Sequence, residues 1–179
     1  ALRIDWKTII RPRIIETYFF DMGRKAPAGK IEATKTEFSY ILGNPPFVGK
    51  HLQNDTQKED SEIIFANVKG AGVLDYVACW YIQAAQYIQG RTTKVAFVST
   101  NSIAQGEQVG ILWGELFGKY NCKIHFAHRT FKWTNEAKGN AAVYVVIIGF
   151  ANYDTTHKSL FEYENIKSEP HEISVKNIN

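Results

Sequence analysis

Residues 38–47 read Phe38-Ser39-Tyr40-Ile41-Leu42-Gly43-Asn44-Pro45-Pro46-Phe47, an apolar run that ends abruptly in an amide, two prolines and an aromatic ring. Residues 38–42 are typical of a short buried strand. A residue before proline is kept out of the helical region, while each proline fixes φ near about −65° and removes a backbone donor. The pattern therefore predicts a strand that ends in a rigid turn rich in hydrogen-bond acceptors.

This turn has the right chemistry to hold a planar amino group. The side-chain oxygen of Asn44 and the carbonyl of Pro45 can accept hydrogen bonds from one NH2 group, and Phe47 can stack on a flat heterocycle. An adenine amine is a poor nucleophile because its lone pair is delocalised into the ring. Two acceptors that pull on its hydrogens favour a pyramidal nitrogen, which could attack a sulfonium methyl directly. The alternative is that Asn-Pro-Pro only ends a strand and starts a loop.

Size and composition indicate one domain. The chain has 179 residues, of which 45% are hydrophobic and 13% aromatic, enough for one sizeable core. It lacks the run of about 18 apolar residues that a membrane helix needs, and its first residues lack a signal-peptide layout, so we expect a cytoplasmic protein without a membrane partner. Cys79 and Cys122 are expected to be reduced and buried. His125 and His128 should point to opposite faces of a strand, so we expect no metal site.

Hydrophobic periodicity predicts alternating strands and helices after the first strand. The expected elements are a helix over 74–89, a strand over 94–98 that opens into a polar loop at 99–102, a helix over 107–119, and strands over 122–128 and 141–150. The last run is too apolar for an edge strand. The turn-rich residues 132–140 predict that the last two strands form a hairpin with a long connection. After Phe150 the strand pattern is lost.

The tetrapeptide Asn44-Pro45-Pro46-Phe47 resembles the catalytic Asn-Pro-Pro-aromatic motif of S-adenosylmethionine-dependent amino-methyltransferases, chiefly the DNA adenine-N6 enzymes. Four separated blocks, at residues 41–50, 72–77, 97–103 and 128–133, are similar to the MmeI-like group and occur in that group's order. This group joins modification and restriction in one polypeptide. The resemblance covers residues 38–150, and residues 11–37 match nothing that we can place.

The resemblance implies an α/β fold: the C-terminal half of a Rossmann-like methyltransferase sheet, with the catalytic strand, two helix–strand units and a final antiparallel hairpin. The first half, which binds the cofactor through a glycine-rich loop, would precede this chain, since neither residues 70–72 nor Gly139-Asn140 directly follow a strand and open a helix. We expect residues 1–150 to be a partial catalytic domain, with 11–37 an insertion or loop. Residues 151–179 would connect toward a missing target-recognition region.

The resemblance also assigns roles to single residues. The turn of Asn44, Pro45, Pro46 and Phe47 would be catalytic, with Asn44 and Pro45 accepting hydrogen bonds from the target amine. Phe47 would stack on a flipped adenine, together with Phe131 or its rival Trp133.

Further residues are assigned to the cofactor and to DNA. Asp75 and Tyr76 would line the cofactor pocket beside Asn44, although a helix cap explains Asp75 equally well. Residues 99–102 lie where open α/β sheets bind ligands, and Glu107 and Gln108 would shape the mouth of the cleft. The DNA-contacting residues would be Lys50, Arg129 and Lys132, although a solvated basic face is the simpler explanation of such residues at a net charge of only +3.

The function expected from these residues is methyl transfer from S-adenosylmethionine to the N6 amine of a flipped adenine in double-stranded DNA, within a restriction-modification protein. No metal or covalent intermediate is needed. The chain alone is expected to be inactive because the cofactor half is missing. Two alternatives remain: a glutamine or ribosomal-RNA amino-methyltransferase, and a non-catalytic module that contacts DNA.

Overall fold

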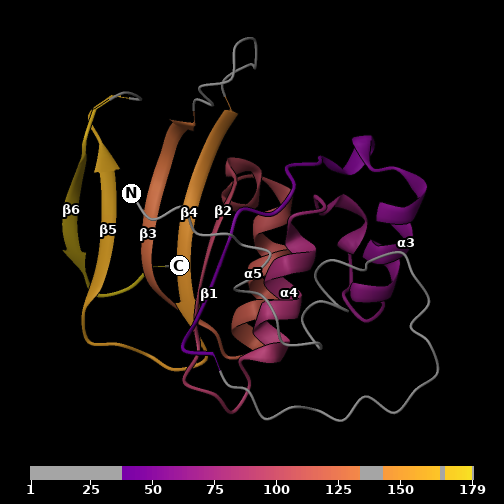
Figure 1. The fold of residues 1–179 in the computed structure, drawn as a ribbon, viewed down its shortest axis with the longest axis horizontal. Coiled ribbons are helices and arrows are strands. Elements are labelled where there is room, and N and C mark those ends of the chain that lie inside the picture. Colours follow the sequence, from indigo (N-terminus) through magenta and orange to yellow (C-terminus); the bar gives the residue numbers. More distant parts are fainter. Residues whose placement is uncertain (1–37, 134–142, 166–167, 179) are drawn as a thin grey trace.

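The computed structural model describes residues 38–133, 143–165 and 168–178, which form a six-stranded mixed sheet in the order β1-β2-β4-β3-β5-β6. Helices lie on one face of this sheet, with α4 and α5 close to the strands and α3 farther out (Figure 1). The elements are β1 (Tyr40–Gly43), η2 (Lys50–Leu52), α3 (Asp55–Ile64), η3 (Ala71–Val73), α4 (Ala78–Tyr87), β2 (Lys94–Thr100), η4 (Asn101–Ala104), α5 (Glu107–Gly118), β3 (Lys123–Trp133), β4 (Val143–Ala151), β5 (Lys158–Tyr163) and β6 (Pro170–Val175).

The strand directions confirm the predicted α/β architecture. β1 and β2 are parallel, and β4 is antiparallel to both β2 and β3. The C-terminal ends of β1, β2 and β3 therefore meet at one edge of the sheet. The predicted antiparallel hairpin is present as β3 and β4, and its connection at 134–142 lies outside the described residues, as does the unplaced stretch 11–37.

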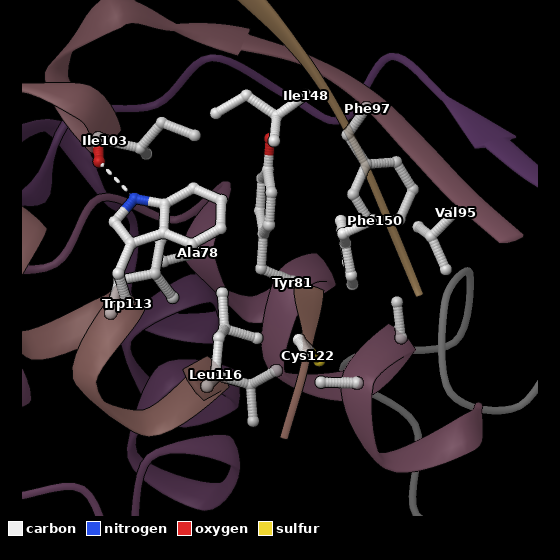
Figure 2. Close-up of a cluster of buried hydrophobic side chains, with 14 of the residues drawn as sticks. Ala78, Tyr81, Val95, Phe97, Ile103, Trp113, Leu116, Cys122, Ile148 and Phe150 are labelled. Atoms are coloured by element: carbon white, nitrogen blue, oxygen red, sulfur yellow. Dashed lines mark hydrogen bonds between the residues drawn. The ribbon is translucent and has the colours of Figure 1, made fainter. Parts of the chain in front are cut away.

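The core lies between the sheet and helices α4 and α5. Tyr81 of α4 is fully buried and contacts Phe97 of β2, Phe150 of β4 and Trp113 of α5, at ring-centroid distances of 5.2, 5.6 and 5.7 Å. Figure 2 shows these side chains together, with the indole N–H of Trp113 donating to the carbonyl of Ile103 at 2.8 Å. This packing fixes η4, and with it the chain segment that follows β2.

The first strand differs from the prediction. Tyr40 is 63% exposed and Leu42 46% exposed, so β1 is not a buried strand. Within the described part of the chain β1 pairs only with β2, and only its alternate residue Ile41 packs against the core. An edge strand with one covered face has the same apolar composition as a buried one, so composition alone could not separate them.

Two further boundaries also need correction. The helix predicted over 74–89 runs only from Ala78 to Tyr87, and it is preceded by a turn at residues 76–77 in which Tyr76 and Val77 are already buried. The predicted polar loop at 99–102 is partly strand, because β2 continues to Thr100 and Ser99 is fully buried. The hydroxyl of Ser99 lies 2.8 Å from that of Tyr81. Ser99 is paired with Val146 of β4 in the sheet, and its buried hydroxyl has a partner in Tyr81.

The segment after Phe150 does not lose the strand pattern. β5 pairs in parallel with β3, and β6 pairs antiparallel with β5, so both strands extend the sheet (Figure 1). Both strands have only six residues, β6 is almost entirely exposed, and β5 mixes three polar with three apolar residues, so hydrophobic periodicity did not reveal them. Helix α3 was also missed, although Asn54 and Gln57 form a capping box that marks its start.

Candidate active site

The Asn-Pro-Pro-Phe turn directly follows β1 at the edge where the parallel strands end. A Cβ atom on Gly43 would lie 3.0 Å from two ring atoms of Phe97, its partner on β2, so a side chain at residue 43 would require this ring to shift. Pro45 is buried, Phe47 is half-buried and Asn44 is exposed. The turn is thus anchored through one proline while its amide and aromatic ring remain accessible.

Backbone contacts determine which acceptors of the turn stay available. The carbonyl of Pro46 accepts a hydrogen bond from the N–H of Val48 at 3.1 Å. Within the described residues, neither the Asn44 side chain nor the Pro45 carbonyl has a hydrogen-bond partner. These are the two acceptors that the sequence predicts for an amino group.

The chain after the motif is fastened to residues 75 and 76. The N–H of Tyr76 donates to the carbonyl of Val48 at 3.0 Å, and the N–H of Lys50 donates to Oδ1 of Asp75 at 2.8 Å. The second carboxylate oxygen of Asp75 accepts from the hydroxyl of Ser102 at 2.6 Å. The motif turn and the segment after β2 are therefore joined through one carboxylate.

This geometry excludes the interpretation of Asp75 as a helix cap. Its carboxylate does not cap α4, whose N-cap residue is Val77 without a side-chain hydrogen bond. The backbone N–H of Asp75 donates to Oε1 of Gln108 at 2.9 Å, so α5 also holds this residue. Gln108 was predicted to shape the cleft, and the structure places it against Asp75.

Tyr76 is buried, and its side chain contacts residues of α3 and α4. Its hydroxyl donates to Oδ2 of Asp60 on α3 at 2.7 Å, and its ring meets the edge of Trp80 at 5.0 Å. Burial, together with the adjacent Asp60 carboxylate, raises the pKa of the Tyr76 phenol well above its ordinary value. The hydroxyl of Tyr76 thus fixes α3 to α4, and its cofactor role remains a prediction.

Phe131 and Trp133 lie at the same edge of the sheet as the motif. Phe131 is opposite Val145, which is in turn opposite Thr100 at the end of β2. From β1 to β3 there are three strand spacings, about 14 Å. Phe131 and Trp133 thus lie on a strand three places from β1, and no ring contact joins either of them to Phe47 within the described residues.

Phe131 packs within a group of aromatic side chains that the sequence analysis did not predict. We call His128, Phe131, Phe161 and Tyr163 the β3–β5 aromatic cluster. Tyr163 stacks on Phe131 at 5.0 Å and 24°, and Phe161 stacks on His128 at 4.2 Å and 8°. Nδ1 of His128 lies 2.8 Å from the Tyr163 hydroxyl, and burial lowers the pKa of this imidazole. The spacing of Phe161 and Tyr163, two residues apart, was the sequence signal that could have predicted a strand with both rings on one face.

The predicted DNA-contacting residues are placed as follows. Arg129 is largely exposed, but its guanidinium pairs with Glu162 at 2.8 Å. Lys132 is half-buried opposite Tyr144, and Lys50 is half-buried beside Asp75. Their contact with DNA remains a prediction.

Within the described ranges, no group of three or more His, Cys, Asp or Glu residues could hold a metal ion. In the same ranges, no helix has the length and apolar character needed to cross a membrane.

The comparisons with known proteins bear on the whole site. A family model described as the DNA-methyltransferase domain of MmeI matches residues 1–162. The chain belongs to this MmeI DNA-methyltransferase family. The family match includes residues 11–37, which the motif comparison left unplaced.

Individual relatives agree with this assignment. DNA methyltransferase A of Bacillus subtilis (strain 168) is 50% identical over 136 residues, which are 75% of this chain and 15% of that protein. The structure of the type IIL restriction-modification enzyme MmeI in complex with DNA matches with 56% identity and a TM-score of 0.75, over 78% of this chain and 19% of MmeI. The type IIG restriction endonuclease BpuSI shares the fold, with 13% identity and a TM-score of 0.50 over 76% of this chain and 19% of BpuSI. The MmeI-family chain thus spans less than a fifth of these relatives' lengths.

Proposed function

We propose that this MmeI-family domain carries the catalytic turn of an enzyme that methylates the exocyclic N6 amine of adenine in double-stranded DNA. The observation that carries the proposal is the pair of free acceptors on the Asn-Pro-Pro-Phe turn. Asn44 is exposed and without a partner among the described residues, and the Pro46 carbonyl is already used by Val48. The Asn44 oxygen and the Pro45 carbonyl remain, and both fit the two hydrogens of one NH2 group.

The residues of the turn act by positioning and polarising the amine. Acceptance of both hydrogens by Asn44 and Pro45 directs the nitrogen lone pair out of the ring plane. The half-buried ring of Phe47 offers a surface on which a base can stack, which contributes about 1–3 kcal/mol per base. This interaction offsets part of the few kcal/mol required to flip a base out of the duplex.

S-adenosylmethionine, when bound, would supply an electrophilic methyl group beside Asn44. The described residues fit this group in part, since the amide of Asn44 has a donor and an acceptor to share between amine and cofactor. Each oxygen of the Asp75 carboxylate already accepts one hydrogen bond, and the backbone N–H groups of Asp75 and Tyr76 donate to Gln108 and Val48. Among the cofactor residues that the resemblance assigns, Asn44 is therefore the one whose side chain keeps a donor and an acceptor unused within the described part of the chain.

Substitution of Asn44 by alanine tests the proposal. The variant is made in the complete gene product, because the chain spans only 15% of its curated relative. We expect methyl transfer to DNA to fall at least about 100-fold, the effect of removing one preorganised polar contact from a transition state. The exposed Asn67→Ala is the matched control and should be unchanged. Methylation by Asn44→Ala within tenfold of the parent would contradict the proposal.

The chemical identity of the product separates the remaining candidates. Membership of a DNA-methyltransferase family favours DNA over the glutamine or ribosomal-RNA amines that the same turn could accept. Enzymatic digestion of the methylated DNA and mass spectrometry of its nucleosides should give N6-methyladenine. A methylated cytosine, or methyl incorporation into protein or RNA alone, would refute the adenine assignment.

Cofactor binding tests the predicted inactivity of residues 1–179 on their own. We expect calorimetry with S-adenosylmethionine to show no binding in the micromolar range for this segment. The complete gene product is the control and should bind. Micromolar binding by the isolated segment would show that its pocket is sufficient.

A further inference from the structure

We infer that Asp75 is a positioning residue that fixes the Asn-Pro-Pro-Phe turn relative to the end of β2, and that it acts without contacting the cofactor. The inference rests on the proposed function, since it names a residue on which the geometry of the methylation site depends. It differs from the cofactor-contacting role that resemblance to the family assigns to Asp75.

Asp75 and Tyr76 hold the chain segment that follows the Asn-Pro-Pro-Phe turn. Oδ1 of Asp75 accepts from the backbone N–H of Lys50 at 2.8 Å, and the next residue, Tyr76, donates its N–H to the Val48 carbonyl at 3.0 Å. Two consecutive residues therefore clamp residues 48–50. A Cβ on Gly49 would lie 3.6 Å from Oδ1 of Asp75, so the approach is close but unstrained.

Asp75 is itself held in place by residues that follow β2 and by α5. Oδ2 accepts from the Ser102 hydroxyl at 2.6 Å, and the hydroxyl of Ser102 lies 2.9 Å from that of Thr100, the last residue of β2. The Asp75 N–H donates to Gln108 of α5 at 2.9 Å. Asp75 is thus held from β2 and α5, and it transmits that position to Lys50.

The chain between this clamp and the catalytic amide is stiff. Pro45 and Pro46 each fix one backbone torsion, and the Pro46 carbonyl is bonded to the Val48 N–H. A shift of residues 48–50 is therefore passed to Asn44 and Phe47 instead of being absorbed. A misplacement of about 1 Å in a reacting group can lower a rate about 100-fold.

These contacts already give each oxygen of the Asp75 carboxylate a structural role. One oxygen accepts from a backbone amide and the other from a serine hydroxyl. A carboxylate oxygen can accept a second hydrogen bond, so the measured Kd for the cofactor separates positioning from cofactor contact.

The test compares Asp75→Ala, Asp75→Asn and Ser102→Ala in the complete gene product. Asparagine keeps an acceptor for the Lys50 N–H and can donate to the Ser102 oxygen, so it preserves the bridge without the charge. Alanine removes both contacts. Asp55→Ala is the matched control, because Asp55 is an exposed residue of α3 whose one ion pair among the described residues is with Lys58.

Three readouts separate positioning from cofactor contact: the Kd for S-adenosylmethionine by calorimetry, the single-turnover methylation rate, and the fluorescence of 2-aminopurine at the target base as a measure of flipping. For Asp75→Ala we expect a Kd within threefold of the parent and a rate about 100-fold lower. Asp75→Asn should recover the rate to within tenfold. Ser102→Ala, which removes one contact and leaves the rest of the clamp, should lie between the parent and Asp75→Ala.

Other results would overturn the inference. A Kd raised more than tenfold in both Asp75→Ala and Asp75→Asn would show a charged cofactor contact. If Asp75→Ala does not fold, Ser102→Ala decides: a rate equal to the parent's refutes the bridge. An active Asp75→Ala beside an inactive Asn44→Ala would refute only this inference, whereas an active Asn44→Ala would refute the proposed function.

Discussion

The ring of Phe126 occupies the space in which a side chain at residue 149 would lie. The two residues face each other on β3 and β4, and a Cβ on Gly149 would be 2.1 Å from Cε1 of Phe126 and within 2.6 Å of two further ring atoms. An aromatic ring thus covers a glycine in the centre of the sheet, so residue 149 cannot carry a side chain unless Phe126 moves.

Gly149→Ala is therefore expected to destabilise the domain. Overpacking of this kind costs typically about 1–3 kcal/mol, because the ring must leave its rotamer or the strands must separate. Chemical unfolding of the purified protein measures the effect.

Gly114→Ala provides the opposite case within the same chain. Gly114 lies on the exposed side of α5, and a Cβ there would meet nothing within 4 Å. Alanine should raise the free energy of unfolding by up to about 1 kcal/mol, since glycine is a poor helix former. If both glycine variants change stability equally, the contact with Phe126 is not the cause.

Tyr81 and Ser99 should behave as a coupled pair. Their hydroxyls lie 2.8 Å apart and both residues are fully buried. Tyr81→Phe leaves the serine hydroxyl without this partner, which should cost about 1–3 kcal/mol. The double variant with Ser99→Ala should cost less than the sum of the two single variants, because no buried hydroxyl is left unpaired. Strict additivity in denaturant unfolding would contradict the coupling.

Stability near β3 should decrease in acid because of His128. Burial lowers the folded-state pKa of His128 below its ordinary value of 6.5. Between these two pKa values the unfolded chain binds a proton at His128 that the folded chain does not. The free energy of unfolding is therefore at its full value above the unfolded pKa and decreases as the pH falls below it.

Hydrogen exchange of β3 and β5, corrected for intrinsic rates, measures this effect between pH 7.5 and pH 5.5. His128→Gln, which cannot titrate, should reduce the loss of protection at the lower pH. The Tyr163 phenol, which faces His128, has a pKa raised by burial and stays neutral throughout this range. An unchanged pH dependence in His128→Gln would remove His128 as its source.

The two cysteines should be inert in the folded protein. Cys79 and Cys122 are buried, and burial raises the pKa of each thiol to about 12. The thiolate is the reactive form, so a disulfide reagent at pH 8 should label neither residue until denaturant is added. Rapid labelling of the native protein would show that the core opens on that timescale.

The local chemistry of the chain was sufficient to predict the turn and most of the element order. Two prolines after an asparagine restrict the backbone whatever surrounds them, so the acceptor turn followed from residues 44–47 alone. The helix at 107–118 and the central strand at 143–151 also followed, because a long apolar periodicity has few other solutions.

Only the tertiary structure showed what these elements contact. β5 and β6 have six residues each, too few for a clear apolar period, and their places in the sheet are given by the parallel pairing of β5 with β3 and the antiparallel pairing of β6 with β5. Ser99 lies within β2 because its backbone pairs with Val146 of β4, and its buried hydroxyl is satisfied by Tyr81.

Asp75 shows most clearly the difference between what the sequence and what the tertiary structure determine. Its sequence position is equally compatible with a helix cap and with a cofactor contact. In the fold its carboxylate joins Lys50, 25 residues earlier, to Ser102, 27 residues later. Sequence determines local backbone preference because torsional restraints act between neighbours, whereas the partners of a polar side chain depend on which distant segments the packed core brings within hydrogen-bond distance.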